Sequence, residues 1–113
     1  MTRMFIITSE FDKLWSDAGN NDEDLRNLQN YLLINPKIVD VIVATAGLRK
    51  LRWKLKGKGK RGGIRILYLD IEEYGIIYFI TIIKKNEKEN LTVKDKKLIN
   101  NKISIIKDIL KQK

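Results

Sequence analysis

The chain has 113 residues, enough for one domain that buries roughly two-thirds of its unfolded surface without a disulfide or a metal. It contains neither cysteine nor histidine, which excludes a disulfide framework, a thiolate nucleophile, the usual general base and the usual metal ligand. Lysine and arginine outnumber aspartate and glutamate by 23 to 14, so the formal net charge is +9.

The first residues, MTRMFIITSEF, lack the layout of a secretory signal peptide, and the longest apolar runs are too short to span a bilayer. We therefore expect a cytoplasmic protein. The apolar run at residues 4–8 predicts a first strand, and residues 9–16 predict a brief helix. A second helix is expected to begin near Asp22, where three consecutive acids suit the positive end of a helix, and to stop at Asn35 before Pro36.

The connector at residues 37–46 has an apolar centre and fits either an extra helical turn or a loop laid over the core. After it, the segment 47–65 concentrates the charge of the whole chain. Nine basic residues lie between positions 49 and 65, and no acid lies between positions 41 and 69. The rest of the chain has 14 basic and 14 acidic residues. A local positive field of this kind attracts polyanions, of which nucleic acid is the commonest in a cell.

From position 50 to 56 this segment alternates, with cations on one parity and large apolar side chains on the other. The cations are Lys50, Arg52, Lys54 and Lys56, and the apolar residues are Leu51, Trp53 and Leu55. Period-two alternation predicts a half-buried strand. A lysine-rich face can also protect a sheet edge from aggregation. The cations continue into a glycine-rich turn at residues 57–63, which edge protection does not require, and this favours polyanion binding.

Two further strands, at residues 64–71 and 76–83, are apolar on both parities and are expected at the centre of the sheet, covered on both faces. Thr92 is a suitable N-cap for a last helix, and Asp95 can complete a capping box. The order β-α-α-β-β-β-α predicts a single α+β domain over residues 1–113. We expect a small antiparallel sheet with two N-terminal helices and a C-terminal helix.

The glycine turn is not a Walker loop, because a strand follows it and no Ser or Thr is placed. Its glycines let Lys58, Lys60 and Arg61 approach a phosphate backbone, although a plain hairpin tip remains the alternative. Acid–base groups must come from Lys, Arg or Tyr, and neighbouring cations can lower the pKa of a lysine. A cation cluster fits cleavage of RNA by its own 2′-hydroxyl, which needs positioning, charge stabilisation and two proton transfers, with no metal or cofactor.

Three motifs carry a resemblance to a known family: GLRKLRW at 47–53, GKGKRGGIR at 57–65 and KNE at 85–87. With NP at 35–36 and DVI at 40–42, they resemble the HigB branch of the RelE/ParE superfamily of type II toxin–antitoxin toxins over roughly residues 5–110. The resemblance implies the α+β fold given above. It also implies a toxin that enters the ribosomal A site, cuts mRNA there and is neutralised by a cognate helix-turn-helix antitoxin.

The resemblance further implies a catalytic pair, Arg65 after the loop and Lys85 at the end of the last strand. Both lie about ten positions from the turn at 72–75, so we expect them at the same end of the sheet. The residues expected to bind RNA and ribosome are Lys50, Arg52, Lys54, Lys56, Lys58, Lys60 and Arg61. The chain departs from the family at Arg52, where RelE-type toxins have lysine, and at Asn86, where they have arginine. The general acid and base therefore stay unassigned.

The sequence leaves two alternative functions open. A ParE-like toxin would inhibit DNA gyrase on the same fold and cut nothing. A non-catalytic basic module would bind RNA along its phosphates. The dense cations favour the endonuclease over the gyrase inhibitor. The aromatic side chains are not expected to form the stacking platform typical of single-strand binders, which disfavours the non-catalytic RNA-binding module.

Overall fold

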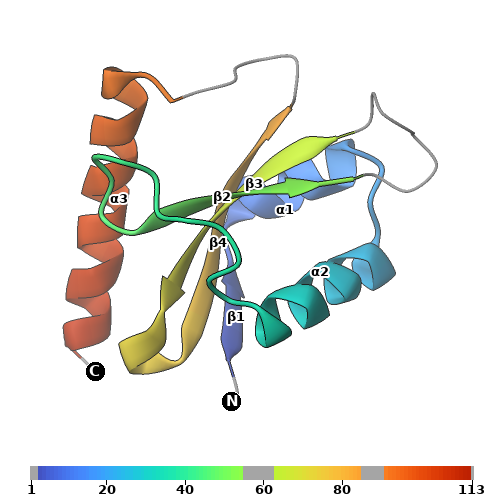
Figure 1. Ribbon diagram of the computed structural model, residues 1–113, viewed down its shortest axis with the longest axis horizontal. Coiled ribbons are helices and arrows are strands. Elements are labelled where there is room, and N and C mark those ends of the chain that lie inside the picture. Colours follow the sequence, from blue (N-terminus) through green and yellow to red (C-terminus); the bar gives the residue numbers. More distant parts are fainter. Residues whose placement is uncertain (1–2, 55–62, 85–90, 113) are drawn as a thin grey trace.

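The computed structural model describes residues 3–54, 63–84 and 91–112. Their elements follow the predicted order (Figure 1). They are strand β1 (Met4–Ile7), helices α1 (Ser9–Asp17) and α2 (Asp22–Ile34), strands β2 (Leu48–Trp53) and β3 (Ile64–Ile71), the short 3-10 helix η2 (Glu72–Tyr74), strand β4 (Ile76–Lys84) and helix α3 (Val93–Lys111). The α+β class and the element order predicted from the sequence are confirmed.

Local hydrogen bonds at the helix N-termini explain where the helices begin. The predicted capping box of α3 is present, with the Asp95 amide donating to the Thr92 hydroxyl and the Thr92 amide donating to the Asp95 carboxylate, both at 3.0 Å. Helix α2 has the same arrangement between Asn21 and Asp24, with both hydrogen bonds at 2.9 Å. Such caps satisfy amides that have no partner inside the helix, and each typically contributes about 1 kcal/mol.

The sheet has four strands in the order β1-β4-β3-β2. Strands β2, β3 and β4 form the antiparallel meander that the sequence predicts. Strand β1 lies parallel to β4, with Met4 opposite Ile76, so the complete sheet is mixed rather than purely antiparallel. The alternation of a four-residue strand does not encode its direction. Here the amide of Met4 donates to the carbonyl of Gly75 at 2.8 Å, which places the start of β1 beside the start of β4.

One irregularity interrupts the β3–β4 ladder. Leu67 pairs with Thr81 and Tyr68 pairs with Phe79, which leaves Ile80 as an extra residue in β4. This is a β-bulge, and it shifts the alternation of every later residue of the strand. Beyond the bulge, Ile83 therefore joins the same face as Ile80.

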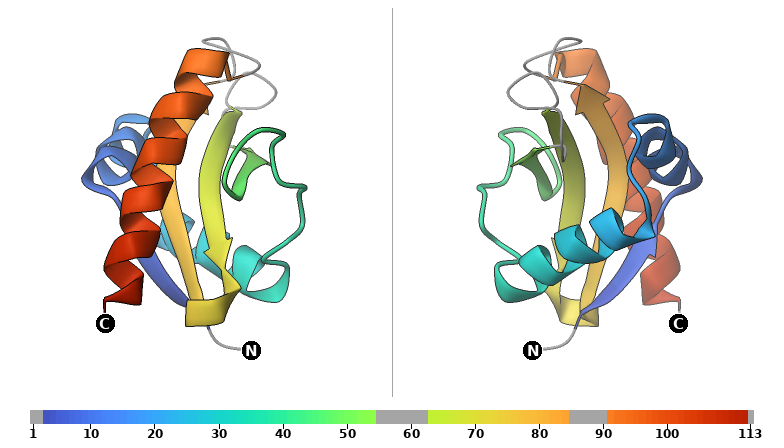
Figure 2. Two further views of the ribbon diagram at one scale, coloured as in Figure 1. Left: turned by 90° about the vertical axis from the view of Figure 1, so that its left-hand side faces the viewer. Right: turned by 90° about the vertical axis from the view of Figure 1, so that its right-hand side faces the viewer.

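Helices α1 and α2 cover one face of the sheet and α3 covers the other, as Figure 2 shows. The first core contains Phe11 and Trp15 of α1 and Leu28 and Leu32 of α2. The second core contains Ile103 of α3. Residues of β3 and β4 contribute to both, so the prediction that these strands are covered on both faces is confirmed. Within the described ranges, no helix combines the length and the apolar character needed to cross a membrane.

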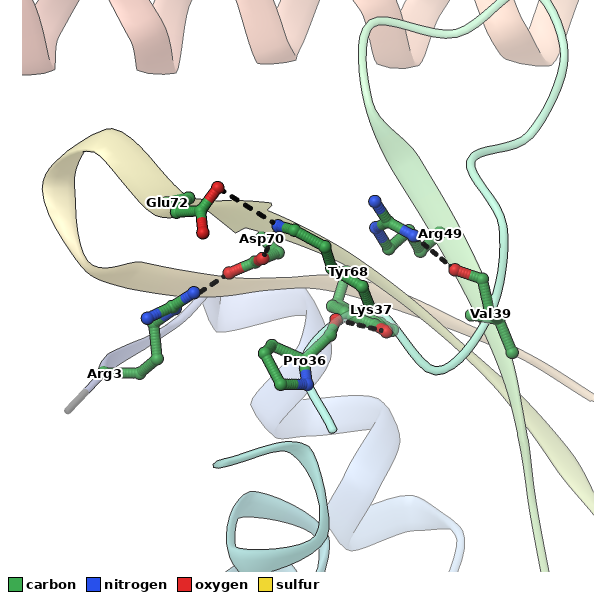
Figure 3. A network of polar contacts seen from close by, with 8 residues as sticks. All are labelled: Arg3, Pro36, Lys37, Val39, Arg49, Tyr68, Asp70 and Glu72. Atoms are coloured by element: carbon green, nitrogen blue, oxygen red, sulfur yellow. Dashed lines mark hydrogen bonds and ion pairs between the residues drawn. The ribbon is translucent and has the colours of Figure 1, made fainter. Parts of the chain in front are cut away.

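The connector between α2 and β2 is a loop, which decides between the two alternatives left open by the sequence. Its far end is fixed to α3, because Asn100 accepts from the Ala46 amide at 2.9 Å and donates to the Ala44 carbonyl at 3.0 Å. Its near end is fixed to the sheet by the Tyr68 hydroxyl, which donates to the Pro36 carbonyl at 2.9 Å (Figure 3).

The same network contains a buried carboxylate. The side chain of Asp70 is 0% exposed and accepts hydrogen bonds from Arg3, at 2.9 Å, and from Lys37 (Figure 3). Burial alone would raise the pKa of Asp70, but the hydrogen bonds from Arg3 and Lys37 outweigh it and the pKa lies below its usual value. Burial also raises the pKa of Tyr68 to about 12, so its hydroxyl stays protonated and able to donate.

We expect Asp70→Ala to lower the free energy of unfolding by about 3 kcal/mol at neutral pH, because Arg3, whose side chain is 3% exposed, loses its carboxylate partner. The contribution of Asp70 is fully present above the unfolded pKa of about 3.9 and is lost as pH falls through its lower native pKa. Urea unfolding across this pH range measures it. The exposed Asp108, replaced by alanine, is the control. A parent–variant difference independent of pH would contradict the expectation.

Candidate functional site

Three strand ends bring the predicted cations to one end of the sheet. β2 ends, β3 begins and β4 ends at the end opposite to η2 (Figure 1). Arg52 lies directly opposite Arg65, and Arg65 lies opposite Ile83. The antiparallel ladder therefore places two arginines side by side although 13 positions separate them along the chain.

Both arginines lie on the face of the sheet that α3 covers. Arg65 shares this face with Leu67, two positions on, and Ile83 opposite it packs against the core that contains Ile103. Lys50 lies opposite Leu67 on the same face. Leu51 and Trp53 point to the other face and pack into the first core. The predicted alternation of cations and apolar residues along β2 is therefore confirmed for its described part.

The electrostatics of this pair leave it available for an anion. Directly opposite residues of an antiparallel pair have Cβ atoms roughly 5 Å apart, and like charges at that distance destabilise a sheet. The salt bridges found within the described residues join Arg3 and Lys37 to Asp70 and Glu72, and none reaches Arg52 or Arg65. Guanidinium groups bind phosphate oxygens in a planar, often bidentate geometry. A phosphate is therefore one anion whose geometry suits this pair.

The predicted site residues divide into two groups. The structure brings Lys50, Arg52 and Arg65 onto one face, with Lys54 directly after β2. The others lie outside the described residues: Lys56, Lys58, Lys60, Arg61 and Lys85. Lys84, the last residue of β4, lies opposite Ile64, so β4 runs to the same end of the sheet as Arg65. Proximity of Arg65 and Lys85 stays a prediction.

One cation of the basic segment supports the fold. The guanidinium of Arg49 donates to the carbonyl of Val39 in the connector (Figure 3). Val41 of the connector also forms an isolated antiparallel bridge with Arg49. These contacts fasten the connector along the outer edge of β2, so Arg49 has a structural role.

Sequence reasoning missed an aromatic pair beside this end of the sheet. The rings of Tyr31, on α2, and Trp53, on β2, have centroids 5.6 Å apart and meet edge-on at 60°. With Arg52 and Lys54 they line an open depression of about 290 Å³. The available signal was weak: Tyr31 follows Leu28 by three positions, which puts it near the core-facing stripe of its helix. That Tyr31 lies beside Trp53 follows only from the packing of α2 next to β2.

Comparison with known proteins identifies the architecture. No protein-family model matches the chain. A free-state double arginine-to-alanine mutant of the E. coli toxin RelE superposes with a TM-score of 0.55, at 20% identity, over 76% of this chain and 86% of that chain. The chain has a RelE-like fold.

Two further structures give the same result. This chain also superposes on a chain of the intact E. coli RelBE toxin–antitoxin complex, with a TM-score of 0.55 at 19% identity over 76% of this chain and 100% of that chain. It superposes likewise on the isolated E. coli RelE toxin, with a TM-score of 0.52 at 19% identity over 87% of this chain and 97% of that chain. At these identities the likeness establishes the arrangement of sheet and helices, and function must be argued from the residues.

Proposed function

We propose that this chain is the toxin of a type II toxin–antitoxin module and acts as a ribosome-dependent mRNA endonuclease of the HigB branch. The observation that carries the proposal is the Arg52–Arg65 cross-strand pair on a RelE-like sheet, with no salt bridge to either arginine from the described residues. The E. coli proteins of similar fold support it, since they are toxins and one was solved with its antitoxin.

The proposed reaction uses the RNA's own nucleophile. The 2′-oxygen attacks the adjacent phosphorus, the bond to the 5′-oxygen breaks, and a 2′,3′-cyclic phosphate and a 5′-hydroxyl result. The protein must hold the phosphate in line and neutralise the charge of the pentavalent transition state. Arg65 is assigned this second task, because it is half-buried and an arginine stays protonated. Lys85 is proposed to add charge and to relay a proton.

The remaining cations are proposed to hold RNA. Lys50 and Arg52 belong to β2, opposite Leu67 and Arg65, and Lys54 directly follows the strand. They are joined in this role by four cations of the glycine-rich turn: Lys56, Lys58, Lys60 and Arg61. Contacts of this type position the backbone and make binding strongly dependent on salt. A helix-turn-helix antitoxin is the proposed protein partner.

Induction of the protein alone in a bacterium is expected to arrest growth and translation, and co-expression of the antitoxin from the adjacent gene should restore both. Primer extension on a reporter mRNA should show in-frame cuts within translated codons, and a message without a start codon should stay intact. The Arg65→Ala protein at the same level is the control. Intact messages beside trapped gyrase–DNA complexes would indicate the ParE-like alternative. Harmless expression of soluble protein would indicate the non-catalytic RNA-binding module.

A further inference from the structure

The depression beside Arg52 lies at an open edge of the sheet. Strand β2 is the last strand in the order β1-β4-β3-β2, so no further strand among the described residues pairs with its outer side. The connector covers that edge near Leu48 and Arg49, where the amide of Ile42 donates to the Leu48 carbonyl at 2.8 Å. The depression lies farther along, where Arg52, Trp53 and Lys54 meet Tyr31 of α2.

Its aromatic walls are held in place and remain partly accessible. Trp53 is half-buried and packs against the first core, which fixes its ring, and Tyr31 is 37% exposed. The two rings meet edge-on at 60°. In an edge-on pair, the ring that presents its edge keeps both its faces free of the partner, so an aromatic face is left for a third ring.

Its cations lack carboxylate partners among the residues that the structure describes. Arg52 and Lys54 are both exposed. Close contact of α2 with β2 explains why Tyr31 touches Trp53, but it does not require two cations around a hollow, neither of them in a salt bridge with a described residue. Aromatic faces beside cations are the arrangement with which proteins hold unpaired bases together with their phosphates.

We propose that this depression binds one unpaired nucleobase of single-stranded RNA, stacked on the Tyr31–Trp53 pair with its flanking phosphate on Arg52 and Lys54. The assignment deepens the proposed function and rests on it for its biological meaning. Arg52 belongs to the depression and also lies opposite Arg65. Trp53 points to the face opposite that of Arg65, so we place the bound base across the β2 edge from the phosphate held at Arg65, with Arg52 between the two.

The test uses Trp53 as its own reporter. The chain has two tryptophans, so the fluorescence of a Trp15→Phe protein reports on Trp53 alone. Trp15 is 3% exposed and lies in the core, away from the proposed ligand. The Trp15→Phe protein is titrated with a short, fully 2′-O-methylated single-stranded oligonucleotide, which cannot be cleaved, and with an abasic oligonucleotide of equal length. We expect the base-bearing oligonucleotide to change the Trp53 fluorescence and to bind about tenfold more tightly than the abasic one.

Tyr31→Leu should abolish most of this tenfold preference while leaving the affinity for the abasic oligonucleotide unchanged. Trp53→Leu, made with Trp15 retained, should do the same in filter binding, which makes the result independent of how well Trp15→Phe folds. Tyr74→Leu is the matched control, since Tyr74 is 44% exposed and lies on η2 at the other end of the sheet. It should leave the preference intact.

Three results would overturn the assignment: equal affinity for the two oligonucleotides, RNA binding without a change in Trp53 fluorescence, or a preference that survives both Tyr31→Leu and Trp53→Leu. Saturation of the Trp53 signal by an acidic peptide but not by RNA would also overturn it in favour of a protein ligand. These readouts need no ribosome. A base preference without mRNA cleavage would refute the endonuclease proposal alone, and cleavage without a base preference would refute the stacking site alone.

Discussion

Arg65→Ala is expected to lower the rate of ribosome-dependent mRNA cleavage about a hundred- to a thousand-fold in a single-turnover assay. Arg65 is half-buried, directly opposite Arg52, and has no salt bridge to the carboxylates of the described residues. Its charge is therefore available to the transition state, where negative charge increases. Lys85→Ala should show a loss of the same order if Lys85 is the second catalytic group.

Two controls separate catalysis from folding and binding. Lys84→Ala removes an exposed cation at the same end of the sheet. Lys84 lies opposite Ile64 on the face away from Arg65, so the rate should change little. Arg65→Lys keeps the charge without the planar guanidinium and should recover part of the rate. Both Arg65 variants should still bind ribosomes and antitoxin. Parental cleavage rates in Arg65→Ala and Lys85→Ala would place the chemistry elsewhere in the cation cluster.

Replacing the four loop cations by alanine is expected to weaken ribosome binding strongly and to flatten its dependence on salt. The variant removes Lys56, Lys58, Lys60 and Arg61. Each lost phosphate contact reduces the slope of log affinity against log salt by about 0.7 to 0.9, so four contacts reduce it by about 3. Single replacements should reduce it in steps. Sedimentation of the protein with ribosomes across a salt series measures both quantities.

A charge-matched variant makes this test specific. It removes three lysines and one arginine, all exposed on α2 and α3: Arg26, Lys97, Lys102 and Lys111. Its net charge falls by the same amount, but its slope should stay close to the parental value. If the loop variant and the charge-matched variant bind alike, the glycine-rich turn is a plain hairpin tip and long-range attraction alone explains the affinity.

Much of the fold could be predicted because its signals are local. Thr92 and Asp95 form a capping box within four residues, and proline at position 36 ends α2 through its own sterics. Strands β3 and β4 were recognised from apolar residues on both parities, and both contribute to two cores. The parallel pairing of β1 with β4 could not be predicted, since it depends on contacts between segments about 70 positions apart.

The same contrast between local signals and contacts of distant segments applies to the candidate site. That Arg52 and Arg65 are cations on neighbouring strands was readable from the sequence, but their direct opposition depends on the register of β2 against β3. The Tyr31–Trp53 contact was not readable, because it needs the position of α2 relative to the sheet edge. The path of the connector was undecidable for a similar reason. The contacts that fix its two ends come from Asn100 and Tyr68, which are distant in sequence.

The extra residue at Ile80 has a consequence for the charge around Arg65. Before it, the even-numbered Ile76 and Tyr78 of β4 face α3, whereas after it the odd-numbered Ile83 does. The bulge thus changes, from even-numbered to odd-numbered, the residues of β4 that face α3. Without it, the uninterrupted alternation would turn Lys84 toward the arginine pair and Ile83 away from it. One inserted residue therefore keeps the Lys84 ammonium off the face that carries the two arginines.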